Sequence, residues 1–236
     1  MARRRRSQHA KTTASSSSSN GANAANEPDD PVSQNPAFKP ARPDGPWDLT
    51  ELADPYAGRV DLGGLLVPGF EGMELRVEFA EERVVAVTCV SGESAIQLQA
   101  FAAARSIGIW DDVRAELAAN VTQQGGVVDT VSGPLGTELR AQVTIQLPDG
   151  TSGAQLVRFV GCDGPRWFLR GVASGQAAVD PATAGPLEQV FRDVVVVRGA
   201  EPMAPREAIP LRLPAGAQAA SETAGTVEAS HSPPVP

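Results

Sequence analysis

The sequence predicts an α+β domain: a mostly antiparallel sheet of about 7–9 strands, with two main helices packed on it, between two disordered tails. Three observations carry this prediction. Several segments alternate apolar and polar residues and are joined by short turns, which favours neighbouring antiparallel strands. Two stretches instead repeat apolar residues every three to four positions, as amphipathic helices do. Both ends of the chain are polar and of low complexity.

Composition sets the expected domain boundaries. Residues 1–45 are rich in Ser, Ala, Asn and Pro and contain a serine run from Ser15 to Ser19. Residues 214–236 have a similar composition and end in Pro-Pro-Val-Pro. Such segments bury too little surface to offset the entropy lost on ordering. We therefore expect a disordered basic tail over 1–45, a single α+β domain over 46–213 and a second disordered tail over 214–236.

Alternating hydrophobicity predicts the strands. Over 73–79, the apolar Met73, Leu75, Val77 and Phe79 alternate with charged residues, as in a half-buried strand. A continuous apolar run at 84–90 is typical of a central strand. Turn signals at Pro148-Asp149-Gly150 and at Gly161 to Pro165 separate later strands, and the second turn predicts a hairpin. The other strands are expected at 96–100, 138–147, 155–160, 166–172 and 193–198.

A period of about four predicts the first helix, with acidic residues at its start and Gly125-Gly126 at its end. A second helix is expected to begin near Asp180-Pro181 or at Pro186. We expect the helices to cover one face or both edges of the sheet. The expected order is four strands, a helix, four strands, a helix and a short last strand, and the seven ranges above are those that the pattern delimits. In element order alone it is similar to Mog1/PsbP-like sandwiches. The apolar helix positions are Ile109, Val113, Leu117 and Val121, then Leu187, Val190, Phe191 and Val194.

Five short motifs resemble an uncharacterised actinobacterial family, known as a domain of unknown function. They are GPWD at 45–48, DLGGL at 61–65, LQAFAA at 98–103, GPRWFLRG at 164–171 and VVVRG at 195–199. The resemblance covers about 45–214 and departs from the family at Ala104, where a proline is expected. It implies a cytosolic location in an actinobacterium and carries no catalytic residues.

Charge and targeting signals limit which partners and which cellular compartment we expect for this protein. Residues 46–236 hold 13 basic and 24 acidic residues, 13 − 24 = −11, which argues against a nucleic-acid groove. The run Arg3 to Arg6 is not followed by the apolar stretch of a signal peptide, and no segment approaches the roughly 20 apolar residues of a membrane span. We expect a cytoplasmic protein without membrane insertion. Cys89 and Cys162 lie in apolar strands and are expected to be small buried side chains.

The usual catalytic chemistries find no support in this sequence. Its two histidines, His9 and His231, both fall in the expected tails, where no general base can be held in place. Ser-His-Asp catalysis and Cys/His zinc sites fail for the same reason. Gly63-Gly64 is followed by no helix and no Lys-Ser/Thr, so it is not a phosphate loop. We expect no catalytic residues, no metal and no cofactor.

An arginine cluster is the most distinctive feature of the folded part. Two interpretations of it stay open. In one, it forms a patch that recognises an acidic peptide, a carboxylate or a second copy of the chain. In the other, its arginines pair with Glu74, Glu78 and Glu138 across strands. Trp110 and Trp167 are expected in the core, and Trp47 is expected to hold the start of the domain on the sheet. The candidate binding residues are Arg140, Arg158, Arg166, Phe168 and Arg170.

The first functional hypothesis is therefore a non-enzymatic cytosolic protein-interaction domain that binds a partner or itself. The second is a small-molecule binder or a carboxylate-dependent enzyme with a pocket between helix and sheet, drawing on acidic side chains such as Glu138 or Asp163. A third hypothesis is weak nucleic-acid contact through Arg3 to Arg6.

Overall fold

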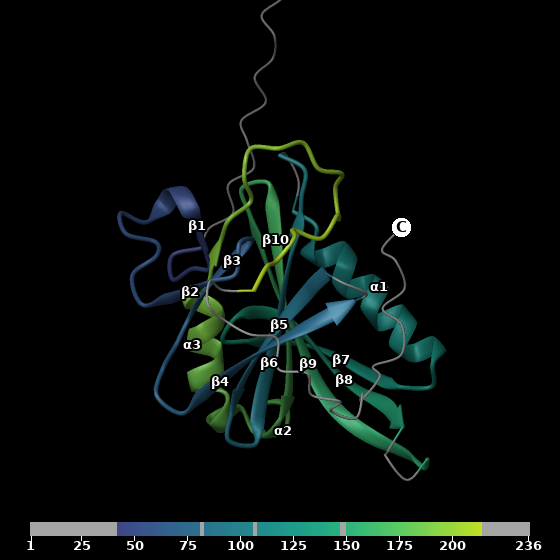
Figure 1. The fold of residues 1–236 in the computed structure, drawn as a ribbon. Coiled ribbons are helices and arrows are strands. Elements are labelled where there is room, and N and C mark those ends of the chain that lie inside the picture. The colour runs from purple at the N-terminus through teal and green to yellow at the C-terminus, as the bar shows by residue number, and fades with distance from the viewer. Residues whose placement is uncertain (1–41, 81–82, 106–107, 147–149, 214–236) are drawn as a thin grey trace, which may run out of the picture. The chain divides into compact units, whose positions relative to one another are not determined.

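Two β-sheets organise this protein in a computed structural model that describes residues 42–80, 83–105, 108–146 and 150–213 (Figure 1). Residues 1–41 and 214–236 of the expected tails and the expected turn at Pro148-Asp149 lie outside the described residues, whereas residues 42–45 of the first expected tail are described. The large sheet has seven strands, and all neighbours in it are antiparallel. Their order across the sheet is β4 (Met73–Ala80), β5 (Arg83–Ser91), β6 (Ser94–Ala102), β10 (Trp167–Gly175), β9 (Ser152–Gly164), β8 (Gly136–Gln146) and β7 (Val127–Gly133).

The large sheet confirms the predicted hairpin and the strands predicted between residues 73 and 172, whereas the strand predicted at 193–198 is shorter, Val195–Val196, and belongs to another sheet. Two runs of consecutive strands, β4 to β6 and β7 to β10, meet where β6 pairs with β10. In the hairpin of β9 and β10, Trp167 lies opposite Gly164 and Ala173 opposite Arg158. The glycines of this hairpin leave room for aromatic rings: a Cβ added at Gly164 would lie 2.1 Å from the Trp167 ring.

A second, smaller sheet was not predicted. Its order is β1 (Trp47–Asp48), β11 (Val195–Val196), β3 (Leu65–Pro68) and β2 (Arg59–Asp61), with β1 parallel to β11 and the other pairs antiparallel. Trp47 was expected to hold the start of the domain on the sheet, and it does so on the small sheet. Its backbone N–H donates to the carbonyl of Val194 at 2.9 Å, and its strand pairs with β11. The two ends of the described chain thus meet in one sheet.

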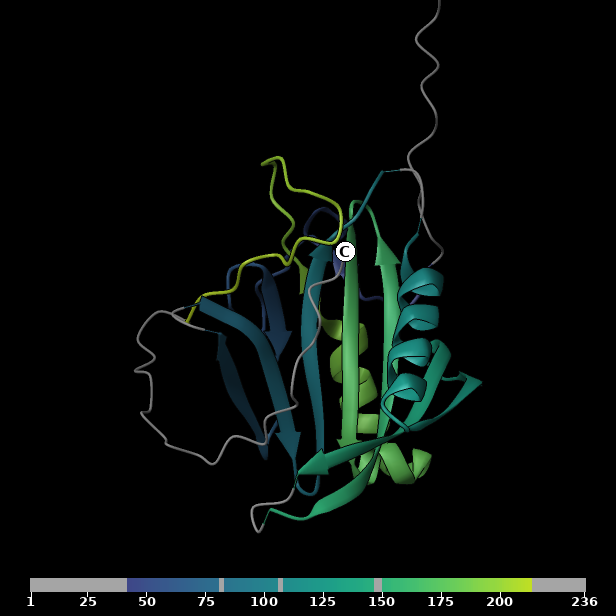
Figure 2. The same ribbon diagram turned by 90° about the vertical axis from the view of Figure 1, so that its right-hand side faces the viewer.

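The helices cover opposite faces of the large sheet, which corrects the expectation of one face or both edges (Figure 2). α1 (Trp110–Gln123) packs over β7, β8 and β9. α2 (Gln176–Val179) and α3 (Gly185–Asp193) lie on the other face, together with the small sheet. Two short 3₁₀ turns complete the elements, η1 (Leu49–Glu51) and η2 (Pro181–Thr183).

Both proposed starts of the second helix are used. Asp180 caps η2, since its side chain accepts from the Ala182 N–H at 2.9 Å, and α3 then starts at Gly185 with Pro186 in its first turn. The main core lies between α3, the small sheet and the large sheet, and Trp167, Leu169 and Phe191 are each at most 1% exposed there. A separate cluster under α1 buries Trp110 against Phe168.

Candidate functional site

The five candidate binding residues do not share one surface. Arg140 and Arg158 are direct cross-strand neighbours, so they lie on the same face of the sheet. Arg158 is also opposite Ala173, which belongs to the core under α2 and α3. Phe168 and Arg170 point to the opposite face, and Arg166 lies in the β9–β10 turn with φ of 68°.

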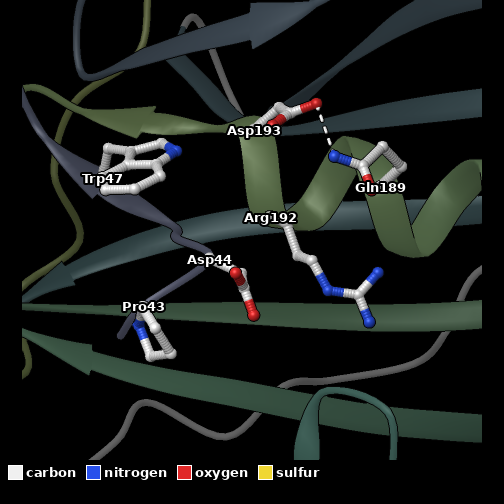
Figure 3. A pocket seen from close by; sticks show the side chains of 6 residues that line it. All are labelled: Pro43, Asp44, Trp47, Gln189, Arg192 and Asp193. Carbon is white, nitrogen blue, oxygen red and sulfur yellow. Dashed lines mark hydrogen bonds between the residues drawn. The ribbon is translucent and has the colours of Figure 1, made fainter. Parts of the chain in front are cut away.

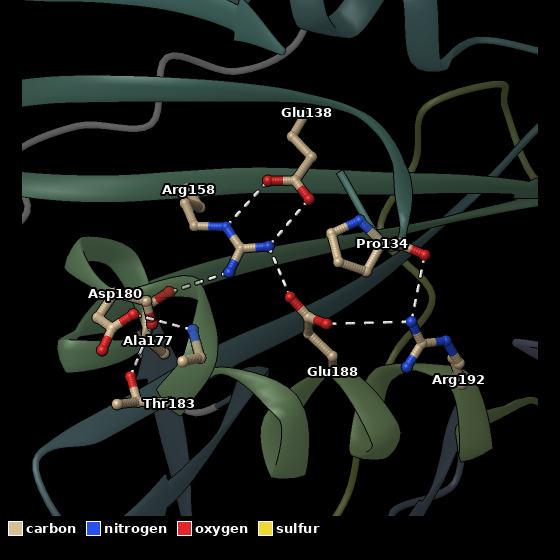
Figure 4. A network of polar contacts seen from close by, with 9 residues as sticks. Pro134, Glu138, Arg158, Ala177, Asp180, Thr183, Glu188 and Arg192 are labelled. Atoms are coloured by element: carbon tan, nitrogen blue, oxygen red, sulfur yellow. Dashed lines mark hydrogen bonds and ion pairs between the residues drawn. The ribbon is translucent and has the colours of Figure 1, made fainter. Parts of the chain in front are cut away.

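Arg158 is the centre of a buried ion-pair network (Figure 4). Its Nε and Nη2 donate to the two carboxylate oxygens of Glu138, both at 2.9 Å, in a bidentate pair. Nη2 also donates to Glu188 of α3 at 2.8 Å, and Nη1 donates to the carbonyl of Ala177 in α2 at 3.0 Å. Arg158 and Glu138 are 1% and 0% exposed, so this guanidinium holds two helices to the sheet and is closed to a partner.

The charge of Arg158 is fixed by this network. Burial alone would lower its pKa, but the hydrogen bonds and charges of Glu138 and Glu188 outweigh burial and keep the pKa above its ordinary value. A second cation, Arg192, lies 3.9 Å from the other oxygen of Glu188. The cross-strand interpretation of the arginines is therefore confirmed for Arg158 and Glu138. Glu188 was missed.

Phe168 belongs to the core under α1. Its ring is stacked on Trp110 with a centroid distance of 5.8 Å and on Phe101 at 6.0 Å. Trp110 is fixed from its other end, where Nε1 donates to the carbonyl of Thr137 at 2.8 Å. Phe168 is 1% exposed, so it supports the sheet beneath α1 and does not present a ring to a ligand.

Arg140 and Arg166 take different positions again. Arg140 is half-buried in β8, and its Nε is buried without an acceptor among the described residues. Arg166 is half-exposed, and its backbone carbonyl accepts from the Ala103 N–H at 2.9 Å. Its charge also lies close enough to lower the pKa of Arg198, after the larger effect of burial. Neither residue lies beside Arg170.

The face of the large sheet that α1 covers in part also carries half-exposed polar side chains, which lie beyond the helix. They are linked across strands: Glu78 of β4 accepts from Thr88 Oγ1 and from Gln97 Nε2, both at 2.6 Å. Gln99 donates to the carbonyl of Val85 at 3.2 Å and accepts from Nη2 of Arg170. Direct pairing of Thr88 with Gln97 and of Gln99 with Arg170 places these side chains on one face. We call it the polar sheet face: Glu78, Thr88, Gln97, Gln99 and Arg170.

Arg170 is the unusual member of the polar sheet face. Its guanidinium lies over the Phe101 ring, 5.4 Å from the centroid, and its only hydrogen bond within the described chain goes to Gln99. Its Nε is buried without an acceptor, and no carboxylate of the described residues lies within ion-pair distance. Burial therefore lowers the pKa of Arg170, with no anion to oppose it.

The acidic side chains considered for catalysis are engaged separately. Glu74 pairs with Arg76, and Glu78 and Glu138 have the partners given above. The carboxylate of Asp163 accepts from the backbone at the start of α1. Between α2, α3 and the sheet, the described side chains leave a cavity of about 10 Å³, which holds one water at most. This cavity is too small for a metabolite.

The cysteines behave as small apolar side chains. Cys89 is fully buried, Cys162 is half-buried, and both are free thiols. Burial raises the pKa of each thiol to about 12. Within residues 42–213, leaving out the gaps, no three His, Cys, Asp or Glu side chains gather as a metal site would require. No described helix has both the length and the hydropathy to pass through a membrane.

Fold and site together define a two-sheet α+β domain with an arginine-bearing polar sheet face beside one covering helix. The chain belongs to the family described as protein of unknown function (DUF3710), whose model matches residues 45–220. No curated protein matches the chain. The expected family type, a domain of unknown function, is confirmed, and its actinobacterial distribution stays a prediction.

Proposed function

We propose that this domain is a non-enzymatic cytosolic protein-interaction domain, and that the polar sheet face binds an acidic segment of a partner protein through Arg170. The observation that carries the proposal is the state of the Arg170 guanidinium. It is largely withdrawn from water, lies over Phe101 and has a buried Nε without an acceptor in the described chain. A guanidinium in this state gains from an incoming carboxylate, because charge-assisted hydrogen bonds are the stronger kind.

The position of Arg170 also favours binding. It lies in the middle of β10, between β6 and β9, so its backbone is fixed by strands on both sides. Gln99 and Phe101 orient the side chain, which reduces the entropy lost when a ligand binds. The net negative charge of the domain repels an acidic partner only at close range, because salt screens charges beyond about 8 Å at physiological ionic strength. Recognition then depends on the local contact with Arg170.

The direct test uses hexaglutamate as the acidic probe. The Nε–H signal of Arg170 in a ¹⁵N NMR spectrum should shift saturably on titration, and Arg170→Gln should weaken binding at least about tenfold, as expected on losing a charged hydrogen bond. Arg114→Gln is the matched control, because Arg114 pairs with the exposed carboxylate of Asp111 within α1 and its guanidinium lies over Trp110. Equal hexaglutamate affinity in Arg170→Gln and the wild-type chain would refute the role of Arg170.

The natural partner can then be sought by quantitative capture from lysate. Proteins retained by wild-type chain and by Arg114→Gln, lost with Arg170→Gln and displaced by hexaglutamate would qualify. Sedimentation of the purified chain distinguishes a second copy as the partner: a dimer that dissociates on Arg170→Gln would assign self-association to this face. Identical capture by all three chains would contradict the proposal.

A further inference from the structure

A cleft at the start of the described chain is separate from the polar sheet face (Figure 3). It lies between the segment leading into β1 and the C-terminal turn of α3, and its volume is about 420 Å³. That volume falls in the range of small-molecule sites, roughly 300–1,000 Å³. The lining residues are Pro43, Asp44, Trp47, Gln189, Arg192 and Asp193.

The walls of the cleft are held together by backbone packing. A Cβ added at Gly45 would lie 2.0 Å from the carbonyl oxygen of Arg192, so the two segments are in direct contact there. Arg59 donates from Nε to the carbonyl of Asp193 at 2.9 Å, which fixes the end of α3. Trp47 is itself anchored through its strand. The cleft is therefore already formed before any ligand arrives.

Opposite charges line this cleft, and its described acidic side chains form no ion pair with Arg192. Asp44 is exposed and has neither a hydrogen bond nor an ion pair through its side chain within the described residues. Asp193 accepts from the amide of Gln189 at 2.9 Å. Arg192 donates to the carbonyl of Pro134 at 3.2 Å and lies 3.9 Å from Glu188, so its guanidinium keeps free donors. A cleft with an unpaired carboxylate and a guanidinium that keeps free donors suits a ligand that carries both charges.

Trp47 supplies the apolar wall. Its side chain is half-buried, whereas Trp110 and Trp167 are 7% and 0% exposed. Figure 3 shows its ring nitrogen on the side toward Asp193 and Gln189. An indole face beside charged groups accepts an apolar or aromatic side chain as well as a nearby cation.

We propose that this cleft binds a free α-amino acid with an apolar or aromatic side chain. Arg192 takes the carboxylate of the ligand, Asp44 and Asp193 take its ammonium group, and its side chain lies over the indole of Trp47. Only a free amino acid carries both charges on one carbon, so an amine or a carboxylic acid alone meets half of the site. The inference is independent of the proposed function of the polar sheet face.

Three probes test this assignment: L-phenylalanine, phenethylamine, which lacks the carboxylate, and 3-phenylpropanoate, which lacks the amine. The readout is the indole N–H signal of Trp47 in a ¹⁵N NMR titration, assigned by its loss in Trp47→Phe. L-phenylalanine should shift the signal saturably, and each analogue should bind at least about tenfold more weakly, because each lacks one charge-assisted contact.

Variants assign the two charges to residues. Asp44→Asn should weaken L-phenylalanine about tenfold and leave 3-phenylpropanoate unchanged, while Arg192→Gln should leave phenethylamine unchanged. Glu71→Gln is the matched control for Asp44→Asn, since Glu71 is an exposed acid outside the cleft. Arg170→Gln should not affect any probe, which separates this test from that of the polar sheet face. No saturable shift with L-phenylalanine, equal binding of phenethylamine, or an Asp44→Asn variant with unchanged affinity would overturn the proposal.

Discussion

The carboxylate of Asp163, near the end of β9, accepts a hydrogen bond of 2.8 Å from the backbone N–H of Ile109, where α1 begins. Its other oxygen accepts from the N–H of Trp110 at 3.3 Å. The helix has no side-chain cap of its own at Ile109, so a residue 54 positions later supplies it. This contact fixes the start of α1 over the strand that also carries Gly161.

The pKa of Asp163 makes this contact sensitive to pH. Burial, the largest effect, raises the pKa above 3.8, although the N–H groups of Ile109 and Trp110 oppose it. The folded chain then holds the proton at higher pH than the unfolded chain does. The stability that this titration contributes is fully present below 3.8 and is lost as pH rises through the folded pKa.

Asp163→Asn removes this titration and keeps one acceptor for Ile109. The free energy of unfolding of the wild-type chain minus that of Asp163→Asn should therefore fall as pH rises from acid toward neutral. Urea denaturation of both chains at matched pH steps measures the difference. A difference that grows with pH over the same range would show that the hydrogen bonds outweigh burial.

Removing the cation from the buried network should be severe. In Arg158→Met the carboxylates of Glu138 and Glu188 lose their common partner while staying buried, which costs about 3–5 kcal/mol of unfolding free energy. Chemical denaturation gives the value. Arg114→Gln breaks an ion pair with an exposed partner on α1 and a cation–π contact with Trp110, and should cost at most about 1.5 kcal/mol.

The network can also be replaced as a unit. The triple change Arg158→Met, Glu138→Leu and Glu188→Leu leaves no buried charge and should recover most of the stability lost in Arg158→Met. If Arg158→Met alone lost less than about 1 kcal/mol, the network would not be closed to water as described.

Gly161 is required by the ring above it. A Cβ at this position would lie 2.4 Å from the indole of Trp110, so Gly161→Ala must displace a stacked aromatic ring. We expect a loss of about 1–3 kcal/mol in thermal or chemical denaturation. Gly185→Ala is the control, because nothing lies within 4 Å of a Cβ there and alanine favours the helix that begins at Gly185. Equal stability of the two variants would contradict the packing of α1.

The two thiols should resist alkylation in the folded chain. With a pKa of about 12 for Cys89 and for Cys162, only about one thiol in 10⁴ is ionised at pH 8, and the thiolate is the reactive form. Iodoacetamide labelling followed by mass spectrometry should be at least about a hundredfold slower than in guanidinium chloride. Rapid labelling of Cys162 in the folded chain would mean that its strand opens readily.

The sequence predicted elements wherever a period repeated several times. The fourfold spacing of Ile109, Val113 and Val121 defined α1, and these residues are at most 8% exposed. Alternation over β4 and β8 likewise identified long strands. Of the small sheet only β11 was predicted, within 193–198, because the strands of this sheet have two to four residues, too few for a period to appear.

The candidate site was harder to predict for a different reason. Phe168 and Arg170 are two positions apart in one strand, so alternation places both on one face, but no local signal says which part of a face a helix will cover. α1 covers Phe168 and leaves Arg170 beyond its edge. Burial of Arg158 depended on Glu188, a charged residue on the apolar side of α3, and its place beside Leu187 was the available signal.

The small sheet has a consequence for synthesis of the chain. Leu66 of β3 pairs with Val195 and Leu65 pairs with Val196, so their partners emerge from the ribosome some 130 residues later. At about 5–20 residues per second this delay is roughly 7–26 s. During that interval these leucines lack the strand that pairs with them in the folded chain, so the small sheet can close only late in synthesis.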